Sequence, residues 1–138
     1  ELTDYGVVSM DHGGSVTGSD LSRAIYHVDQ LGRYMEEFFD DFDLLLSPTM
    51  AVPAFPIDDR PRSIGGRQVD PFWGFVPFTY PINMSGQTAA SIPCGYSSDG
   101  MPIGLHIVGP RGSESRVLQA AAAFERALPL GDQRPMVN

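Results

Sequence analysis

The stretch of sequence that decides the fold is Asp99-Gly100-Met101-Pro102-Ile103-Gly104-Leu105-His106-Ile107-Val108-Gly109. Asp-Gly between apolar segments is typical of a β-hairpin turn. The residues after the turn predict a strand from Ile103 to Val108, with Ile103, Leu105 and Ile107 on one face because successive side chains of a strand alternate. A partner strand is predicted from Thr88 to Tyr96. We therefore expect a hairpin linked through residues 97–100.

Helices are predicted on both sides of this hairpin in the sequence. The segment Thr17-Gly18-Ser19-Asp20 has the spacing of a capping box, with Asp in the place of Glu, and begins a helix expected from about Asp20 to Asp41. A last helix is expected from about Glu114 to Leu128, with Ser113 as its N-cap. An earlier helix should end at His12-Gly13-Gly14. The long helix is predicted by apolar residues that recur every three or four positions, namely Leu21, Ile25, Val28, Leu31, Met35, Phe38 and Phe42.

The remaining segments predict one more strand and a long loop. Leu44 to Leu46, followed by Ser47-Pro48, is typical of a central strand buried on both faces. Seven prolines between Pro48 and Pro81 indicate an ordered surface loop, in which Gly65-Gly66 forms a turn. The expected fold class is α/β, with about three strands, a long helix and a C-terminal helix over residues 1–128, and a polar tail at 129–138. Three strands cannot complete a sheet around a central strand, so we expect an incomplete fold.

Charge and composition exclude several classes of protein. The formal net charge of −8 would repel a phosphate backbone, which argues against nucleic-acid binding. The sequence contains no apolar run of 18 residues, so it predicts no membrane-spanning helix. Cys94 is the only cysteine, so we expect no internal disulfide and a reducing, cytoplasmic location. Because the chain begins at Glu1 rather than at methionine, we expect it to be part of a longer polypeptide.

The residues that usually carry catalysis are absent or isolated. No Gly-x-Ser-x-Gly elbow is present, and the nine basic residues are all arginine, so no lysine can serve as a base. The three histidines are far apart, and we expect neither a metal nor a cofactor. We expect His106 to have a structural role, His27 to be exposed and Cys94 to be a small buried thiol. The acidic residues are interpreted as a solvated face, with a cation site as the alternative, and are Glu36, Glu37, Asp40, Asp41 and Asp43.

Three blocks of the sequence together resemble the carboxy-terminal region of the amidase-signature family. The blocks lie in the same order as in the family, the last helix follows them, and the resemblance covers nearly the whole chain. They are residues 42–49 (Phe-Asp-Leu-Leu-Leu-Ser-Pro-Thr), residues 78–95 (Phe-Thr-Tyr-Pro-Ile-Asn-Met-Ser-Gly-Gln leading into Ala-Ser-Ile-Pro-Cys-Gly) and residues 99–109, the hairpin stretch quoted above.

The resemblance implies a large α/β hydrolase with a mixed central sheet between helices. Members of this family cleave carboxamide C–N bonds with a Ser–cis-Ser–Lys triad, in which lysine acts through one serine on the nucleophilic serine. The triad belongs to the amino-terminal half of the family, and nothing in this chain matches that half. We therefore expect no catalytic residue here and no activity from the chain alone. Its expected role is to supply part of the sheet and a wall of the substrate channel.

Two groups of residues acquire expected roles from the resemblance. The aromatic segment before the Phe-Thr pair should line the substrate channel and favour an apolar or aromatic acyl group, although it could merely anchor the loop; it comprises Phe72, Trp73, Phe75, Val76 and Phe78. The turn from Asn83 to Gln87 should support the site from behind, unless it only packs the loop. The support residues are Thr49, Asn83, Ser85 and Gly86.

The leading hypothesis is an amidase fragment that acts on a small-molecule amide when joined to the N-terminal part of the same enzyme. One alternative is the A subunit of a glutamyl-tRNA(Gln) amidotransferase. There the family resemblance implies an acidic residue where this chain has Val76, which weakens that alternative. Another is a non-catalytic binding or scaffold module. We also expect a homo-oligomer, because unpaired strand edges favour association.

Overall fold

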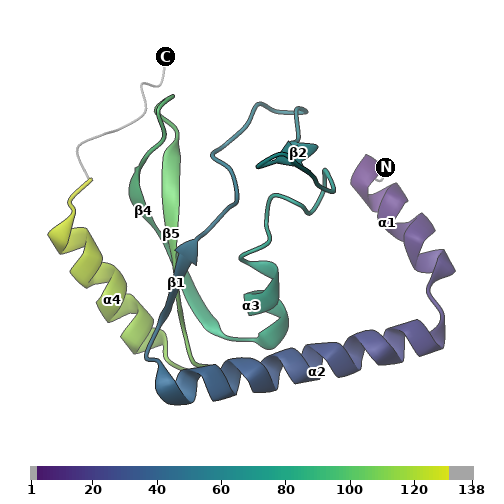
Figure 1. Cartoon of the computed structure of the whole chain (residues 1–138), viewed down its shortest axis with the longest axis horizontal. Coiled ribbons are helices and arrows are strands. Elements are labelled where there is room, and N and C mark those ends of the chain that lie inside the picture. The colour runs from purple at the N-terminus through teal and green to yellow at the C-terminus, as the bar shows by residue number, and fades with distance from the viewer. Residues whose placement is uncertain (1–2, 131–138) are drawn as a thin grey trace.

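The computed structural model describes residues 3–130. Its elements are, in order, α1 (Asp4–Ser15), α2 (Gly18–Asp41), β1 (Leu45–Pro48), β2 (Ser63–Ile64), β3 (Arg67–Gln68), α3 (Tyr80–Ser85), β4 (Thr88–Tyr96), β5 (Pro102–Gly109) and α4 (Glu114–Ala127). Figure 1 shows α2 running along one side of the molecule, with α4 beside the sheet and α1 at the opposite end. Within the described residues, no helix combines the length and apolar character that a bilayer crossing requires.

The main sheet has three antiparallel strands in the order β1-β5-β4. The predicted hairpin is confirmed, since Ala90 pairs with Ile107 and Ile92 with Leu105, and Ser97 donates its backbone N–H to the Met101 carbonyl at 2.8 Å. The prediction of a central first strand is wrong for the described residues. β1 pairs only with β5 and forms an edge of the sheet. Leu46 of this strand is 58% exposed.

The core lies between β5, β4 and α4. Ile107 and Ile92 pack against Val117 and Ala121 of α4, with Phe124 at the margin. Ile107 and Leu105 of the predicted apolar face lie at this core. Ile103 is 37% exposed, however, and Val108 on the predicted opposite face is fully buried, so burial does not alternate along β5. α4 begins at Glu114 as expected, but Ser113 does not cap it. The Ser113 hydroxyl donates instead to the Pro110 carbonyl at 2.6 Å.

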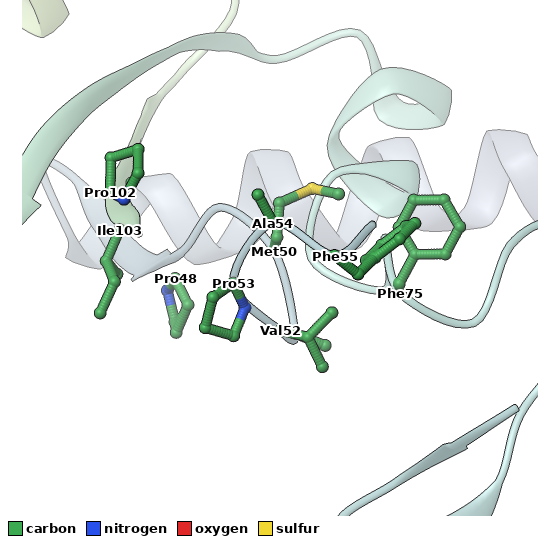
Figure 2. Close-up of a pocket in the computed structure, with 11 residues that line it drawn as sticks. Pro48, Met50, Val52, Pro53, Ala54, Phe55, Phe75, Pro102 and Ile103 are labelled. Atoms are coloured by element: carbon green, nitrogen blue, oxygen red, sulfur yellow. The ribbon is translucent and has the colours of Figure 1, made fainter. Parts of the chain in front are cut away.

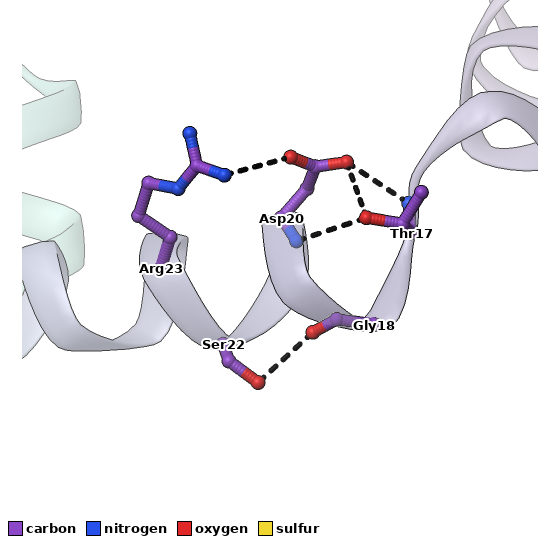
Figure 3. A network of polar contacts seen from close by, with 5 residues as sticks. All are labelled: Thr17, Gly18, Asp20, Ser22 and Arg23. Carbon is purple, nitrogen blue, oxygen red and sulfur yellow. Dashed lines mark hydrogen bonds and ion pairs between the residues drawn. The ribbon is translucent and has the colours of Figure 1, made fainter.

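α2 begins with the predicted capping box (Figure 3). The Asp20 N–H donates to the Thr17 hydroxyl at 3.2 Å, and the Thr17 N–H donates to the Asp20 carboxylate at 3.1 Å. Hydrogen bonds from the Thr17 hydroxyl first, and from its backbone N–H second, lower the pKa of Asp20. The predicted apolar stripe is covered unevenly. Leu31 and Met35 are half-buried, whereas Ile25 in the first half of the helix is 61% exposed. His27 is exposed, as expected.

Several boundaries differ from the sequence predictions. α1 continues through Gly13 and Gly14 to Ser15, because neither glycine adopts a positive φ that would end the helix. The predicted turn at Asn83–Gln87 is instead the end of α3, closed by Gly86 with φ 72°. Cys94 is half-buried rather than buried. The predicted loop contains β2 and β3, joined by Gly65 and Gly66, both at positive φ as a tight turn requires. Residues 131–138 of the predicted tail lie outside the described residues.

Gly104 of β5 lies beneath two hydroxyl groups and has no room for a side chain. The Thr49 and Ser91 hydroxyl oxygens are 2.6 Å apart. A Cβ at position 104 would approach them to 2.6 Å and 2.8 Å, respectively. The close approach of β1 to β5 at this point therefore depends on glycine.

His106 is the buried titratable group of the same strand, at 5% exposure. Its ring Nδ1 lies 3.5 Å from the Ser47 hydroxyl of β1. Burial lowers the pKa of His106, because the charged imidazolium loses hydration. The structural role expected for His106 agrees with this position in the sheet.

Gly104→Ala is expected to destabilise the fold by about 1–3 kcal/mol, because the methyl group overpacks the hydroxyl pair. Gly32→Ala is the matched control, since nothing lies within 4 Å of its added methyl group; it should be neutral or stabilising by about 0.5–1 kcal/mol in a helix interior. Urea unfolding followed by circular dichroism measures both variants. Equal effects of the two substitutions would contradict the close-approach argument.

His106 predicts a pH-dependent contribution to stability. The folded-state pKa is lowered, so the contribution is present above the unfolded-state pKa of about 6.5 and is lost as pH falls through the folded-state value. His106→Gln should therefore flatten the dependence of the urea midpoint on pH between about 7.5 and 5. His27→Gln on exposed α2 should leave the slope as in the parent chain. An unchanged slope in His106→Gln would refute the assignment.

Candidate functional site

Two backbone hydrogen bonds position the segment that follows β1. The Thr49 N–H donates to the Gly104 carbonyl at 2.9 Å, and the Ala51 N–H donates to the Phe75 carbonyl at 3.1 Å. The first bond extends the pairing of β1 with β5, and the second links the segment to the aromatic loop before α3. Residues 49–55 are thus held between the sheet and that loop.

An apolar cavity of about 560 Å³ lies along this segment. Phe55 and Phe75 lie side by side at one end of it, with ring centroids 5.1 Å apart and an edge-on angle of 79°, while Pro102 and Ile103 of β5 lie at the other end (Figure 2). The cavity has a size typical of small-molecule sites. The residues that line it are Pro48, Met50, Ala51, Val52, Pro53, Ala54, Phe55, Phe75, Pro102, Ile103 and Gly104.

A tight turn orders the aromatic loop. One carboxylate oxygen of Asp70 accepts the N–H groups of Phe72 and Trp73 at 2.8 and 2.9 Å, and the Gly74 N–H donates to the Asp70 carbonyl at 2.8 Å. A Cβ at Gly74 would approach the Val69 side chain to 2.4 Å. Glycine is therefore required at this point, and the turn directs Phe72 and Phe75 to different neighbours.

Phe72 and Trp73 belong to an aromatic cluster that joins the loop to α1 and α3. The Tyr5 ring lies 5.6 Å from that of Phe72 and 5.1 Å from that of Trp73, and Trp73 lies 5.1 Å from Tyr80. Burial first, and the charges of Tyr5 and Asp70 second, raise the pKa of Tyr80.

A second cavity, of about 840 Å³, adjoins the aromatic cluster beside Tyr5 and Phe72. The Arg60 guanidinium lies 4.9 Å from the centroid of the Phe72 ring, a distance at which a cation is attracted to an aromatic face. The other charged side chains that line the cavity are Asp4, Asp58, Asp59 and Arg62. This cavity therefore combines acidic and basic groups, in contrast to the apolar cavity.

The structure divides the five predicted channel residues. Phe75 alone among them lines the apolar cavity, whereas Phe72 lines the charged cavity. Trp73 lies in the aromatic cluster. Val76 is half-buried, and its carbonyl accepts the Thr79 hydroxyl at 3.2 Å; Phe78 is partly exposed. The five residues therefore do not form a single wall in this chain.

The four predicted support residues lie on two elements. Thr49 follows β1 and bonds to Ser91 and Gly104, whereas Asn83, Ser85 and Gly86 belong to the end of α3. Asn83 is exposed, and Ser85 is buried. The Ser85 carbonyl accepts a hydrogen bond from the Arg111 guanidinium at 2.9 Å. That guanidinium would lie 3.3 Å from a Cβ at Gly86, so Arg111 covers the end of α3.

Sequence reasoning missed the residues that form most of the apolar cavity. The sequence predicts a loop over residues 50–55, although the unbroken apolar run from Met50 to Phe55 is unusual for a solvated loop and favours a lining segment. The sequence gives no indication of the role of Arg111, because its partner is the backbone carbonyl of Ser85, which is distant in sequence. Across residues 3–130, no group of three or more His, Cys, Asp or Glu side chains is placed to hold a metal ion.

The chain matches a family model described as Amidase over residues 3–118. It is 33% identical over 136 residues to an acylamidase of Rhodococcus erythropolis, a match that covers 98% of this chain and 28% of that protein. It is 39% identical over 100 residues to the A subunit of the glutamyl-tRNA(Gln) amidotransferase of Halothermothrix orenii, covering 72% of this chain and 20% of that protein. The chain thus spans between 20% and 28% of the length of these two relatives.

Solved structures resemble the fold over the same extent. A bacterial aryl acylamidase of the amidase-signature family matches 98% of this chain and 29% of its own, with a TM-score of 0.86 and 34% identity. The 6-aminohexanoate cyclic dimer hydrolase matches 98% of this chain and 31% of its own, with a TM-score of 0.81 and 33% identity. The family match and these structures confirm the resemblance stated above. The chain therefore belongs to the amidase family of amidase-signature hydrolases.

Proposed function

We propose that this chain is the carboxy-terminal portion of an amidase that hydrolyses carboxamide C–N bonds in non-peptide substrates. The observation that carries the proposal is one of coverage. Nearly the whole chain matches an acylamidase, yet it accounts for only 28% of that protein. The absence of lysine from all 138 residues also supports the proposal. The lysine of a Ser–cis-Ser–Lys triad would have to come from the N-terminal part of the enzyme.

The proposed reaction proceeds through an acyl-enzyme. Lysine, acting through the bridging serine, removes the proton of the nucleophilic serine, which attacks the amide carbonyl. The amine leaves with a proton, and water then releases the acid. Backbone N–H groups stabilise the oxyanion. None of these groups is assigned to the present chain, which contributes part of the sheet and the walls of a substrate site.

The names of the relatives favour a neutral amide substrate. One relative is an acylamidase, and one solved structure is an aryl acylamidase. We propose that this chain serves an enzyme acting on amides with an apolar or aromatic group. Phe75 supports the proposal from its place in the apolar cavity.

A second candidate is the A subunit of a glutamyl-tRNA(Gln) amidotransferase, favoured by the 39% identity to such a subunit. Glutamine carries an amino group that an acidic side chain would bind. Val76 occupies the position where we expect that acidic residue, and its side chain cannot accept a hydrogen bond. The general amidase is therefore the better-supported candidate.

We also propose a partner for the uncovered surfaces. Leu21 and Ile25 of α2 are 56% and 61% exposed, and β1 has one unpaired edge in the described sheet. The N-terminal part of the same enzyme would bury these apolar groups and pair the edge. Without that part, the chain would associate with itself, because uncovered edges and apolar faces favour pairing. The location we propose is the cytoplasm.

A chimera tests the amidase proposal. The corresponding segment of the Rhodococcus erythropolis acylamidase is replaced by this chain, and acetanilide hydrolysis is followed by aniline release. The chimera should hydrolyse acetanilide and lose activity to a serine-directed phosphonate, whereas the isolated chain should show no turnover. Turnover by the isolated chain that the phosphonate blocks, or a folded but inactive chimera, would refute the proposal. The unmodified acylamidase is the positive control.

The same chimera separates the two candidate functions. Val76→Asp should raise the ratio of kcat/KM for glutamine to that for acetanilide by about tenfold, because a charged hydrogen bond contributes roughly 1.5–3 kcal/mol. Val76→Asn, of similar shape without the charge, is the matched control and should change the ratio much less. A parent chimera that already prefers glutamine would favour the amidotransferase subunit instead.

A further inference from the structure

We propose that the charged cavity, of about 840 Å³ beside Tyr5 and Phe72, is a binding site for a small zwitterion, a molecule with a carboxylate at one end and an ammonium group at the other. This inference goes beyond the proposed function, because the described residues that line the charged cavity all differ from those that line the apolar one. It assigns no step of amide hydrolysis to this chain. Figure 1 shows the location of the cavity, where the chain before β2 approaches the start of α1.

Charged side chains of both signs line this cavity without neutralising one another. Within residues 3–130, none of the five forms an ion pair with another residue, whereas opposite charges do pair in three places elsewhere, twice along α2 and once between Asp43 and Arg116. Their charges are therefore available to a ligand. The carboxylates belong to α1 and to the loop between β1 and β2, and the guanidinium groups belong to that loop; the five residues are Asp4, Asp58, Asp59, Arg60 and Arg62.

Apolar groups also line the cavity, at Tyr5, Pro71 and Phe72. The Phe72 ring holds the Arg60 guanidinium 4.9 Å from its centroid, and the Tyr5 ring centroid lies 5.6 Å from that of Phe72. No aromatic ring holds Arg62 in this way in the described part of the chain, so we assign the Arg62 guanidinium to the ligand carboxylate. The apolar groups would contact the hydrocarbon part that joins the two charged ends of the ligand.

A turn orders the acidic side of the cavity. The Asp59 N–H donates to the Pro56 carbonyl at 3.2 Å. Asp58 has a φ of 67°, in the left-handed region that aspartate and asparagine adopt more readily than most other residues. The adjacent carboxylates of Asp58 and Asp59 therefore stand on ordered backbone, and we assign them to the ligand ammonium group.

The lining favours a zwitterion over a ligand with a single charge. An acid without an amine would meet Arg62 but would also be repelled by the neighbouring carboxylates, and an amine without an acid would leave the guanidinium groups unpaired. A zwitterion gains a partner at each end. A metal ion fits less well, because no group of three or more His, Cys, Asp or Glu side chains in residues 3–130 is placed to coordinate one.

Trp73 reports occupancy of the cavity, because it is the only tryptophan of the chain and its ring centroid lies 5.1 Å from that of Tyr5. Three compounds with the same ring are titrated against the chain: 4-(aminomethyl)benzoate carries both charges, 4-methylbenzoate only the negative one and 4-methylbenzylamine only the positive one. The zwitterion should change Trp73 fluorescence saturably and bind about fivefold more tightly than either control, the most that one exposed ion pair usually contributes. No saturable response, or an affinity no higher than that of a control compound, would overturn the proposal.

Two variants each remove one sign of charge. Arg62→Gln should weaken binding of the zwitterion and of 4-methylbenzoate about fivefold without weakening that of 4-methylbenzylamine. The double variant Asp58→Asn/Asp59→Asn should weaken binding of the zwitterion and of 4-methylbenzylamine instead, and asparagine is compatible with the φ of position 58. Equal losses for all three compounds in Arg62→Gln would show a change of cavity shape rather than of charge and would overturn the assignment.

Matched substitutions outside the cavity are the controls. Arg67→Gln on β3 and Asp11→Asn on α1 remove the same charges at exposed positions that do not line it, and should leave all three affinities unchanged. A loss in either control as large as in the cavity variants would show a general effect of net charge and overturn the site. If the double variant loses its circular dichroism spectrum, Arg62→Gln decides the question.

The chimera tests the amidase proposal separately. An active chimera, together with a chain that does not bind the zwitterion, would overturn the cavity assignment alone. A folded but inactive chimera, together with zwitterion binding that follows the expected charge pattern, would overturn the proposed function and leave the binding site in place.

Discussion

β5 is the constraint on which the rest of the structure depends, because in the described sheet it pairs on both edges and contacts material on both faces. Ile107 packs toward α4, and on the opposite face His106 lies beside Ser47 while Gly104 lies beneath Thr49 and Ser91. A side chain at Gly104 would displace β1 from β5. The segment after β1, and with it the apolar cavity, would then lose its position.

The apolar faces of the hairpin and of α2 are buried to different extents. α4 buries one face of the hairpin, and α3 lies near the second half of α2, where Leu31 and Met35 are half-buried. The first half of α2 presents Leu21 and Ile25 to solvent. A capping box can begin a helix there without tertiary contacts, so local hydrogen bonds explain why α2 starts at Gly18. They do not explain its apolar stripe, which calls for a partner surface.

The site is best understood as two cavities that share one ordered loop. The turn at Asp70 directs Phe72 toward Tyr5 and the charged cavity, while Phe75 contacts Phe55 in the apolar one. Family membership indicates amide hydrolysis in general, and the chain carries no lysine to supply the base. Within the described residues, one cavity has apolar walls and the other carries charged groups.

The sequence by itself determined the hairpin, the long helix with its cap, the last helix and the family, because each depends on local periodicity, turn chemistry or motif order. Tertiary structure alone decided that β1 lies at an edge, that Gly13 and Gly14 continue a helix, and that the aromatic residues divide between two cavities. The reason is distance along the chain. Thr49 meets Ser91, Ala51 meets Phe75 and Arg111 meets Ser85, and no local pattern specifies such contacts, which arise only when β5 brings those segments together.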